Sequence, residues 1–460
     1  MHRLGHLETE PTDMPSTPDS ATTVKARRGG PAGTGNTAAG KGGSIDFREA
    51  LDLILTAESG NEELTEHQRE ELPAIASHWL QSPQEPPILL DKTYGKKWME
   101  MIRTHLFLKS NGPVHGLPKS VKSPKPITVD FSGIPFPPTE KPKFTFIDLF
   151  AGIGGFRLAL QELGGKCLFS SEWDVHAKET YFNNYGEVPF GDITKLSSHK
   201  LFSGQIDILA GGFPCQPFSR AGVSARTSLG QEHGFSCETQ GQLFFDIVNI
   251  AKIHRPKVIL LENVGNLLRH DGGNTFRTIK SQIENNLKYK VFDHSVYNAN
   301  VLVPQNRVRC IIVAFKEDVV PKWSMPKLSG TPLALGSIIE KLPIQNSYTI
   351  SKKLWDGHIR RSNRNIARGA GFTAFLKDLS KPSTTLVARY YKDGKECLIP
   401  QPNQPDELPR MLTERECARL QGFPEEFQPH SSKMRAYKQF GNSVPVPLIS
   451  FVANNIVKYL

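Results

Sequence analysis

Between Phe144 and about Pro321, short apolar runs rich in β-branched residues alternate with amphipathic segments of helical length. The clearest runs are FTFIDLF, KCLFSSEWD, IDILAGG, KVILLENV and RCIIVAF, and the segments between them include FRLALQELG and GQLFFDIVNIAKIHR. Strands that alternate with helices form a parallel sheet covered by helices on both faces, because the crossover connections are right-handed. The pattern therefore predicts a doubly wound, mostly parallel α/β sheet whose ligands bind at the carboxyl ends of the strands.

The chain before this region divides by composition into three parts. Residues 1–44 are rich in Gly, Ala, Thr and Pro and contain almost no large apolar side chains, so we expect a disordered tail. Apolar residues at spacings of three and four predict a small helical module over residues 45–110. Residues 111–143 carry clustered prolines with basic residues, which is typical of an extended linker.

The chain after the predicted sheet loses the alternation of strands and helices. Residues 322–412 combine lysines and arginines with scattered aromatic residues and glycines, which predicts a second, smaller and irregular domain with a basic face. Residues 413–460 return to helical spacing, and we expect these C-terminal helices to pack back on the main domain, residues 144–321.

Charge and cysteine content limit the partners and the compartment. The formal net charge of +10 favours a polyanionic partner, with nucleic acid as the leading candidate. The six cysteines include no CxxC pair, which indicates reduced thiols rather than disulfides or a structural zinc site. No apolar run approaches the roughly 20 residues of a membrane span, and no signal-peptide pattern is present. We therefore expect a soluble cytoplasmic protein without a membrane partner.

A glycine-rich turn follows the first predicted strand. Gly152, Gly154 and Gly155 would let the backbone approach a ligand closely, and the alternative is a turn with only a packing role. Glu172 ends the next predicted strand, twenty residues after Gly152, where a carboxylate can accept hydrogen bonds from ribose hydroxyls. The glycine spacing departs from GxGxxG, which favours an adenosine ligand such as S-adenosylmethionine (SAM) over a dinucleotide.

Further polar groups are predicted at the ends of neighbouring strands. Cys215 lies between two prolines directly after IDILAGG, where exposure and nearby cations would favour a nucleophilic thiolate; the alternative is a buried, inert thiol. Glu262 ends the run ILLENV, where a carboxylate is costly unless it is paired or working, and a structural salt bridge is the alternative. Arg307 and Arg309 would point to one side of an extended segment and could grip a carbonyl or a phosphate.

These motifs, in this order, resemble those of the DNA (cytosine-5)-methyltransferases. The resemblance covers residues 144–460 and rests on DLFAGIGG, SEWD, GDIT, GGFPCQPFS, LLENV, QNRVR, RECARLQGFP and FGNSVPVPLI. Two further stretches, GVSARTSLGQEHGFSCETQGQLFFD and TTLVARYYKDGKECLI, are most similar to the bacterial Dcm-like subgroup, which methylates CC(N)GG-type sites. The resemblance implies a SAM-dependent enzyme with a Rossmann-like catalytic domain, residues 144–321, and a target-recognition domain, residues 322–412.

The resemblance also implies a covalent mechanism. The Cys215 thiolate would add to C6 of a cytosine flipped out of the duplex, and C5 would then take the methyl group of SAM. Glu262 would hydrogen-bond to N3 of the base or protonate it. Arg309, with Arg307 beside it, would contact the base carbonyl and supply positive charge where negative charge develops.

For the cofactor, the resemblance implies that the adenine stacks on Phe150 and that Glu172 and Trp173 hold the ribose and the adenine. Asp192 would reach the adenine amino group, and Asn442 would close the pocket. The implied SAM-binding residues are Phe150, Gly152, Ile153, Gly154, Gly155, Glu172, Trp173, Asp192, Ile193 and Asn442.

For the substrate, the resemblance implies double-stranded DNA, and the long polar loop over residues 217–240 is suited to closing over it. His233 and Cys237 on this loop are interpreted as packing residues, and no metal ion is expected. A solvated basic face is the alternative for the arginines among the implied DNA-binding residues, which are Gln216, Ser219, Arg360, Arg361, Arg364 and Arg368. We expect a monomer, with a cognate restriction endonuclease as a genetic rather than a physical partner.

Other functions stay open as alternatives. An NAD oxidoreductase would explain the glycine turn and Glu172 but leaves Cys215, Glu262 and Arg309 without a joint purpose. A non-catalytic DNA-binding repressor would fit the basic charge and the N-terminal helices, and an RNA-directed relative would use tRNA as the acceptor. A zinc-dependent cytosine deaminase is excluded, because Phe218 stands where its PCxxC element needs the second cysteine.

Overall fold

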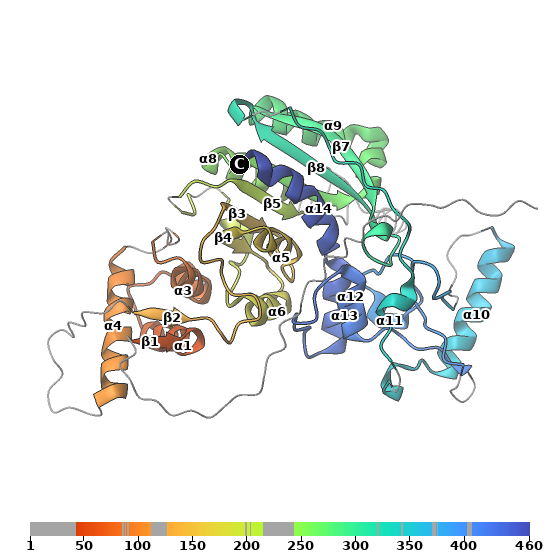
Figure 1. Cartoon of the computed structure of the whole chain (residues 1–460), viewed down its shortest axis with the longest axis horizontal. Coiled ribbons are helices and arrows are strands. Elements are labelled where there is room, and N and C mark those ends of the chain that lie inside the picture. The colour runs from red at the N-terminus through yellow and green to blue at the C-terminus, as the bar shows by residue number, and fades with distance from the viewer. Residues whose placement is uncertain are drawn as a thin grey trace, which may run out of the picture. The chain divides into compact units, whose positions relative to one another are not determined.

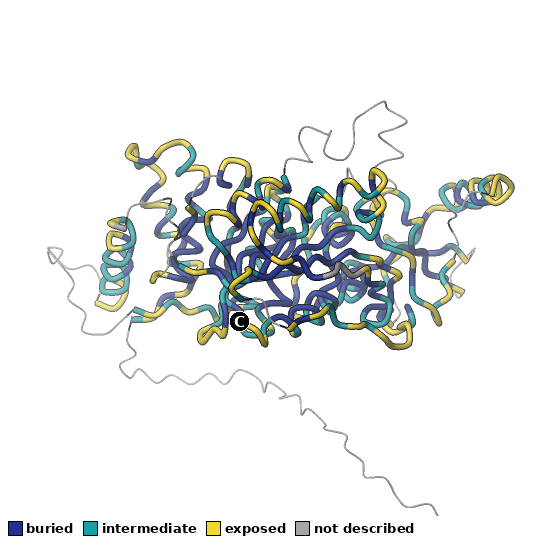
Figure 2. Tube along the Cα trace, turned by 90° about the horizontal axis from the view of Figure 1, so that it is seen from above, coloured by how far each residue is buried: buried dark blue, intermediate teal, exposed yellow. Residues whose placement is uncertain are grey.

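The structure is a computed structural model that describes residues 43–84, 87, 89, 92–111, 127–197, 200–202, 204–214, 243–319, 322–341, 344–369, 374, 376–402 and 407–460. All of these residues belong to one compact unit, Gly42–Leu460. Figure 2 shows buried residues along the inner stretches of its trace and exposed residues along the outer ones.

The main sheet is mixed, with mostly parallel strands. Its strands are β3 (Phe144–Leu149), β4 (Gly165–Ser171), β5 (Ile208–Gly212), β6 (Val258–Val264), β7 (Tyr289–Asn298) and β8 (Val308–Lys316), in the order β4-β3-β5-β6-β8-β7. The first four strands are parallel, whereas β8 is antiparallel to β6 and to β7. The chain order reverses beside β3, and ligands bind at such a switch point in doubly wound sheets.

Alternating side chains give the sheet two apolar faces. On β8, Ile311 and Val313 enter one core and Ile312 and Ala314 enter the other, because successive strand residues point to opposite faces. Helices α5 (Gly155–Glu162) and α14 (Val446–Ile456) cover the first face and lie together in Figure 1. Helices α8 (Leu243–His254) and α9 (Asn274–Ser281) cover the second. The doubly wound, mostly parallel sheet predicted from the sequence is therefore confirmed.

The N-terminal part contains helices and a short parallel strand pair. Its elements are β1 (Ser44–Asp46), α1 (Phe47–Glu58), α2 (Glu66–Glu70), α3 (Leu72–Gln81), α4 (Lys92–Asn111) and β2 (Thr128–Asp130), drawn in Figure 1 in red to orange. Helix α1 begins at Phe47 because the Asp46 carboxylate accepts hydrogen bonds from two backbone N–H groups of its first turn. Thr65 and Gln68 form a capping box at the start of α2.

The N-terminal helices share the second core of the main sheet. Phe47, Ile75 and Trp79 belong to the same apolar cluster as Ile147 of β3 and Phe169 of β4. Buried apolar area is the main source of stability, so this part of the chain contributes to the core of the sheet itself.

The described part of the predicted linker is packed against the protein. Residues 128–130 form strand β2, Phe131 stacks on Phe47 with ring centroids 5.0 Å apart, and Ile134 is buried. Turns and bends follow β2 over residues 132–136, and apolar side chains of this segment lie in the core. The boundaries of the predicted domains stay predictions.

Residues 322–412 contain few regular elements. In the described part of this region, the α-helices are α10 (Lys352–Ala367) and α11 (Tyr390–Asp393), 3-10 helices occur at Leu335–Ile338 and Asn346–Tyr348, and isolated bridges join other segments. The C-terminal region adds α12 (Glu414–Gln421) and α13 (Lys433–Asn442) before α14, and α13 packs on α6 (Val175–Tyr185) through the ion pair of Lys438 with Asp174, at 2.6 Å. Among the described helices, none is long and apolar enough to cross a membrane.

Candidate active site

The glycine turn after β3 is conformationally demanding. Phe150 has φ +56° and Gly152 has φ +57°, in a region that side chains other than glycine rarely adopt. A Cβ atom on Gly154 would lie 2.2 Å from the Tyr185 ring, and one on Gly155 would lie 2.7 Å from Val444 Cγ2, so these two glycines are needed for packing. A Cβ atom on Gly152 would meet no atom of the described residues within 4 Å. The turn therefore has free space beside Gly152, whereas Gly154 and Gly155 are packed tightly against neighbouring side chains.

Glu172 links this turn to the end of β4. Its carboxylate accepts hydrogen bonds from the backbone N–H groups of Gly152 and Asp174, each at 2.8 Å. Burial raises the pKa of Glu172, and these backbone donors oppose the rise. The adjacent Trp173 is 86% exposed, which is unusual for a large aromatic side chain and leaves its ring faces accessible to a ligand.

The other predicted cofactor residues lie around the same edge. Phe150 is half-buried beside the second core, and Ile153 and Ile193 are buried. Asp192 is exposed and accepts hydrogen bonds from the backbone N–H and the hydroxyl of Thr194, at 3.0 and 2.8 Å. Asn442 is exposed at the end of α13, and the residues after it pack on the turn through the contact of Val444 with Gly155.

Glu262 and Arg309 form an ion pair at the end of β6. Arg309 Nε lies 2.6 Å from Glu262 Oε1, and the two side chains are 11% and 10% exposed. Glu262 Oε2 lies 3.4 Å from the position of a Cβ atom on Gly212, the last residue of β5. Asn263 Nδ2 donates to the Phe213 carbonyl at 3.3 Å, so β6 also fixes the backbone that leads out of β5.

Arg307 has a different environment from Arg309. Its side chain is 1% exposed and donates hydrogen bonds to the carbonyls of Leu386, Gly441 and Ser443, at 2.8, 3.1 and 2.5 Å. The guanidinium thus ties residues 322–412 to the segment that carries Asn442. Three of its hydrogen bonds thus go to backbone oxygens inside the protein, and the expectation that Arg307 contacts a base carbonyl stays a prediction. The spacing of the two arginines could not reveal these partners.

Several predicted residues fall outside the described residues. These are Cys215, Gln216 and Ser219, together with the loop over residues 217–240 that carries His233 and Cys237. The last described residue before this gap is Pro214, two residues after β5 ends. The first described residue after it is Leu243, which begins α8.

The predicted DNA-binding arginines lie on or next to α10. Arg360, Arg361, Arg364 and Arg368 are all exposed, whereas His358 and Ser362 form the buried side of the helix. Spacings of four residues place Arg360, Arg364 and Arg368 on one face. Arg361 points to the side of this face and lies 3.6 Å from the Asp393 carboxylate.

One group of side chains has the composition of a metal site. Atoms of His176, Glu179 and His430 lie within 4.8 Å of one another. However, the Ser432 backbone N–H donates to His430 Nδ1 at 2.8 Å, which leaves the ring proton on Nε2, 3.3 Å from a Glu179 oxygen. A protonated nitrogen has no lone pair for a metal, so the contacts fit a close His–Glu pair without a metal ligand at His430 Nε2, which makes no hydrogen bond among the described residues.

Comparisons with known proteins place this architecture in a family. A family model described as C-5 cytosine-specific DNA methylase matches residues 144–458. Type II methyltransferase M.DsaV of Dactylococcopsis salina is 44% identical over 324 residues, which cover 70% of this chain and 88% of that protein. The DNA-cytosine methyltransferase of Escherichia coli strain K12 is 39% identical over 376 residues, covering 70% of this chain and 79% of that protein.

Solved structures agree on the fold. The S. pombe Dnmt2 methyltransferase has a TM-score of 0.52 at 16% identity, covering 68% of this chain and 98% of that chain. The Entamoeba histolytica methyltransferase EhMeth has a TM-score of 0.51 at 18% identity, with the same coverage. At these identities, the likeness concerns the fold alone.

Proposed function

Since this chain belongs to the C-5 cytosine-specific DNA methylase family and is a DNA (cytosine-5-)-methyltransferase, we propose that it acts through a transient bond between Cys215 and a flipped-out cytosine. The Cys215 thiolate adds to C6 of the base, which makes C5 nucleophilic. SAM supplies the electrophilic methyl group, and S-adenosylhomocysteine leaves. Loss of the C5 proton and cleavage of the S–C6 bond then restore the aromatic ring and the free thiolate.

The ion pair at the end of β6 carries this proposal. Glu262 hydrogen-bonds to N3 of the base, and Arg309 orients that carboxylate at 2.6 Å and presents positive charge to the base carbonyl. Glu262 Oε2 faces Gly212, the last residue of β5, and Cys215 follows Gly212 by three residues in the sequence. A purely structural salt bridge would not require this position beside the exit of β5.

The turn after β3 and the end of β4 supply the proposed SAM site. The open side of Gly152 leaves room for the methionine end, and the exposed ring of Trp173 offers a stacking surface. Each carboxylate oxygen of Glu172 accepts one hydrogen bond from a backbone N–H group. Each oxygen has a second lone pair that can accept a hydrogen bond from a ribose hydroxyl. Asp192 and Asn442 are the remaining members of the proposed site.

Double-stranded DNA is the proposed acceptor, with residues 322–412 as the target-recognition domain. The exposed arginines of α10 suit contacts with phosphates, which anchor a protein without specifying sequence. The relatives M.DsaV and M.SsoII are both named Type II methyltransferases, which supports a role in restriction–modification. We further propose that the target belongs to the CC(N)GG type, a prediction that bisulfite sequencing of DNA from expressing cells checks.

Transfer of tritiated methyl groups from SAM to duplex DNA tests the chemistry. Cys215→Ala should abolish transfer, with a loss of at least about 1,000-fold, because the thiolate supplies the covalent step. Cys237→Ala is the matched control and should keep wild-type activity. Duplex DNA with 5-fluorocytosine at the target should trap a covalent complex with the wild-type protein but not with the Cys215 variant, since fluorine cannot leave C5 as a proton does.

Other outcomes would favour the alternatives. Full methyl transfer by Cys215→Ala would refute the covalent mechanism. Transfer to tRNA but not to duplex DNA would indicate the RNA-directed branch of the family. Specific DNA binding with no transfer to any acceptor would instead support a non-catalytic DNA-binding protein.

A further inference from the structure

The segment over residues 185–191 is held against the edge strand of the main sheet. The Phe190 N–H donates to the Ser170 carbonyl at 2.9 Å, and the Glu172 N–H donates to the Phe190 carbonyl at 2.8 Å. Phe190 thus forms a parallel bridge with Ser171, the last residue of β4, and this bridge fixes the backbone of Glu172. The same segment continues directly into Asp192. It therefore sets the position of both carboxylates that are proposed to hold SAM.

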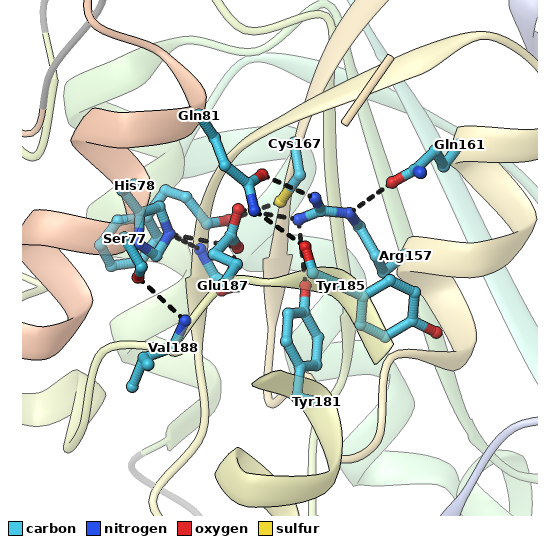
Figure 3. Close-up of polar contacts among 12 residues, drawn as sticks. Ser77, His78, Gln81, Arg157, Gln161, Cys167, Tyr181, Tyr185, Glu187 and Val188 are labelled. Carbon is cyan, nitrogen blue, oxygen red and sulfur yellow. Dashed lines mark hydrogen bonds and ion pairs between the residues drawn. The ribbon is translucent and has the colours of Figure 1, made fainter. Parts of the chain in front are cut away.

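The opposite side of this segment is held by side chains from the N-terminal helices. Four polar side chains at or within α3 contact it, and Figure 3 shows three of them, Ser77, His78 and Gln81. The contacts are Gln81 Nε2 to the Tyr185 carbonyl at 2.8 Å, the Val188 N–H to Ser77 Oγ at 3.0 Å, His78 Nε2 to Glu187 Oε1 at 3.2 Å, and the Gly191 N–H to Glu71 Oε1 and Oε2 at 3.0 and 3.1 Å.

A buried ion cluster lies in the middle of these contacts. Glu187 is paired with Arg157 of α5 at 3.0 Å and accepts a hydrogen bond from the Ser170 hydroxyl at 2.6 Å. Arg157 also donates to Gln81 Oε1 at 3.2 Å, so the cluster joins α3 to α5 and to β4 (Figure 3). Burial alone would raise the pKa of Glu187, but Arg157 and His78 outweigh it and hold that pKa well below its usual range.

Glu71 makes the contact nearest to the proposed cofactor site. Its buried carboxylate receives the N–H of Gly191, the residue before Asp192. A Cβ atom on Gly191 would lie 2.7 Å from Glu71 Oε1, so a larger residue at position 191 would displace this carboxylate. Burial lowers the pKa of Lys178 of α6, and the Glu71 and Glu172 carboxylates oppose this shift.

We propose that Glu71 and the polar side chains of α3 hold residues 185–191 in place and so order Glu172 and Asp192, the carboxylates proposed to bind SAM. Glu71 is the principal positioning residue for SAM in this set. This inference rests on the proposed function, in which Glu172 and Asp192 hold the cofactor. Glu71 and α3 precede residue 144, where the match to the family model begins. The N-terminal helices thus act in the methyltransferase reaction itself, by ordering the SAM site before the cofactor binds.

Substitutions at Glu71 in the full chain test the proposal. Glu71→Ala removes the acceptor for the Gly191 N–H, and removal of a charge-assisted hydrogen bond of this kind should raise the Kd for SAM about tenfold. The KM for SAM should rise by the same factor, while kcat at saturating SAM stays within about twofold. Glu71→Gln keeps a carbonyl oxygen at the same place and should restore the Kd to within about threefold of wild type.

Neighbouring variants serve as controls and as a second route. Glu70→Ala removes a carboxylate whose side chain is 56% exposed, and it should leave SAM binding unchanged. Ser77→Ala removes the acceptor for the Val188 N–H and should raise the Kd for SAM about threefold. Calorimetric titration with SAM, at a temperature well below each variant's unfolding midpoint, measures these constants. Should Glu71→Ala fail to fold, Ser77→Ala decides the question.

The results separate this inference from the proposed function. A wild-type Kd for SAM in Glu71→Ala, or in Ser77→Ala where that variant has to decide, overturns the inference. A loss of kcat with an unchanged KM for SAM overturns it as well. The assignment of the cofactor site fails instead if Glu172→Ala and Asp192→Ala both bind SAM as tightly as wild type.

Discussion

Asp148 lies within β3 with its side chain fully buried. Burial raises the pKa of this carboxyl to about 8 from its ordinary value of 3.8; the Arg157 guanidinium opposes the rise and Glu187 adds to it. The folded protein therefore holds Asp148 protonated at neutral pH. Because the folded-state pKa is the higher one, this contribution to stability is complete below pH 3.8 and is lost as the pH rises through 8.

Asp148→Asn should remove this pH dependence, since the amide has a similar shape and no titrating proton. Between pH 6 and pH 8 the wild-type protein should lose about 2 kcal/mol of unfolding free energy that the variant keeps. Urea unfolding at both pH values measures the difference, with Asp52→Asn on the exposed side of α1 as the control. Parallel pH profiles for wild type and Asp148→Asn would contradict the protonated state.

The residues of the active site could be predicted from the sequence to different degrees. Glu262 on β6 and Arg309 on β8 lie on neighbouring strands, and their side chains form an ion pair. Arg307 has the same local pattern as Arg309, yet its guanidinium binds the carbonyls of Leu386, Gly441 and Ser443. These partners lie far along the chain, so only the tertiary fold determines which arginine is available to a substrate. For Cys215, the expectation from the sequence stays a prediction.

At the scale of the element, α10 has one basic and one buried face. Arg360 and Arg364 lie on the exposed face, opposite His358 and Ser362. If this face contacts phosphates, replacing both arginines by alanine should weaken binding to all duplex sequences alike. The slope of log K against log salt should then become shallower by about 0.9 for each phosphate that the protein no longer neutralises.

Binding titrations over a range of salt concentrations, with cognate and unrelated duplexes, measure the effect of the α10 substitutions. Arg361→Ala is the matched control, because Arg361 lies near Asp393 at the side of the basic face and should change the slope less. Loss of affinity for the cognate duplex alone would mean that these arginines contact base edges and not phosphates.

The elements themselves were predictable where the hydrophobic period was clear. The run RCIIVAF indicates a strand, and β8 forms there, but the run does not show that β8 is antiparallel to β6. Likewise the spacing over residues 45–110 predicts a helical module, and α3 forms within it. The function inferred for the polar side chains of α3 depends on their contacts with residues 185–191, more than 100 residues later in the chain. A local sequence pattern cannot predict such contacts.

At the scale of the whole molecule, the two faces of the main sheet tie distant parts of the chain together. The first core joins α5 and α14 to residues of the 322–412 region such as Leu335 and Leu398. The second core joins the sheet to Phe47 and Trp79 of the N-terminal helices. Within the N-terminal part, the buried Glu58 carboxylate accepts a hydrogen bond from Trp98 Nε1 at 2.9 Å, which fastens α1 to α4.

Because the N-terminal helices and the main sheet share the second core, we expect these two parts to unfold together. Trp79 is buried and packs on Trp98 with ring centroids 5.3 Å apart, so Trp79→Ala should cost about 3–5 kcal/mol. Leu53→Ala, on a half-buried side chain of α1, should cost clearly less.

Thermal unfolding followed by circular dichroism, and the loss of methyl transfer after heating, should have the same midpoint and shift together in Trp79→Ala. If the N-terminal helices were an independent domain, the Trp79 variant would show an early, separate transition, and methyl transfer would survive it. A joint shift is expected instead, because residues that order the proposed SAM-binding edge and residues that fill the second core lie on the same helix, α3.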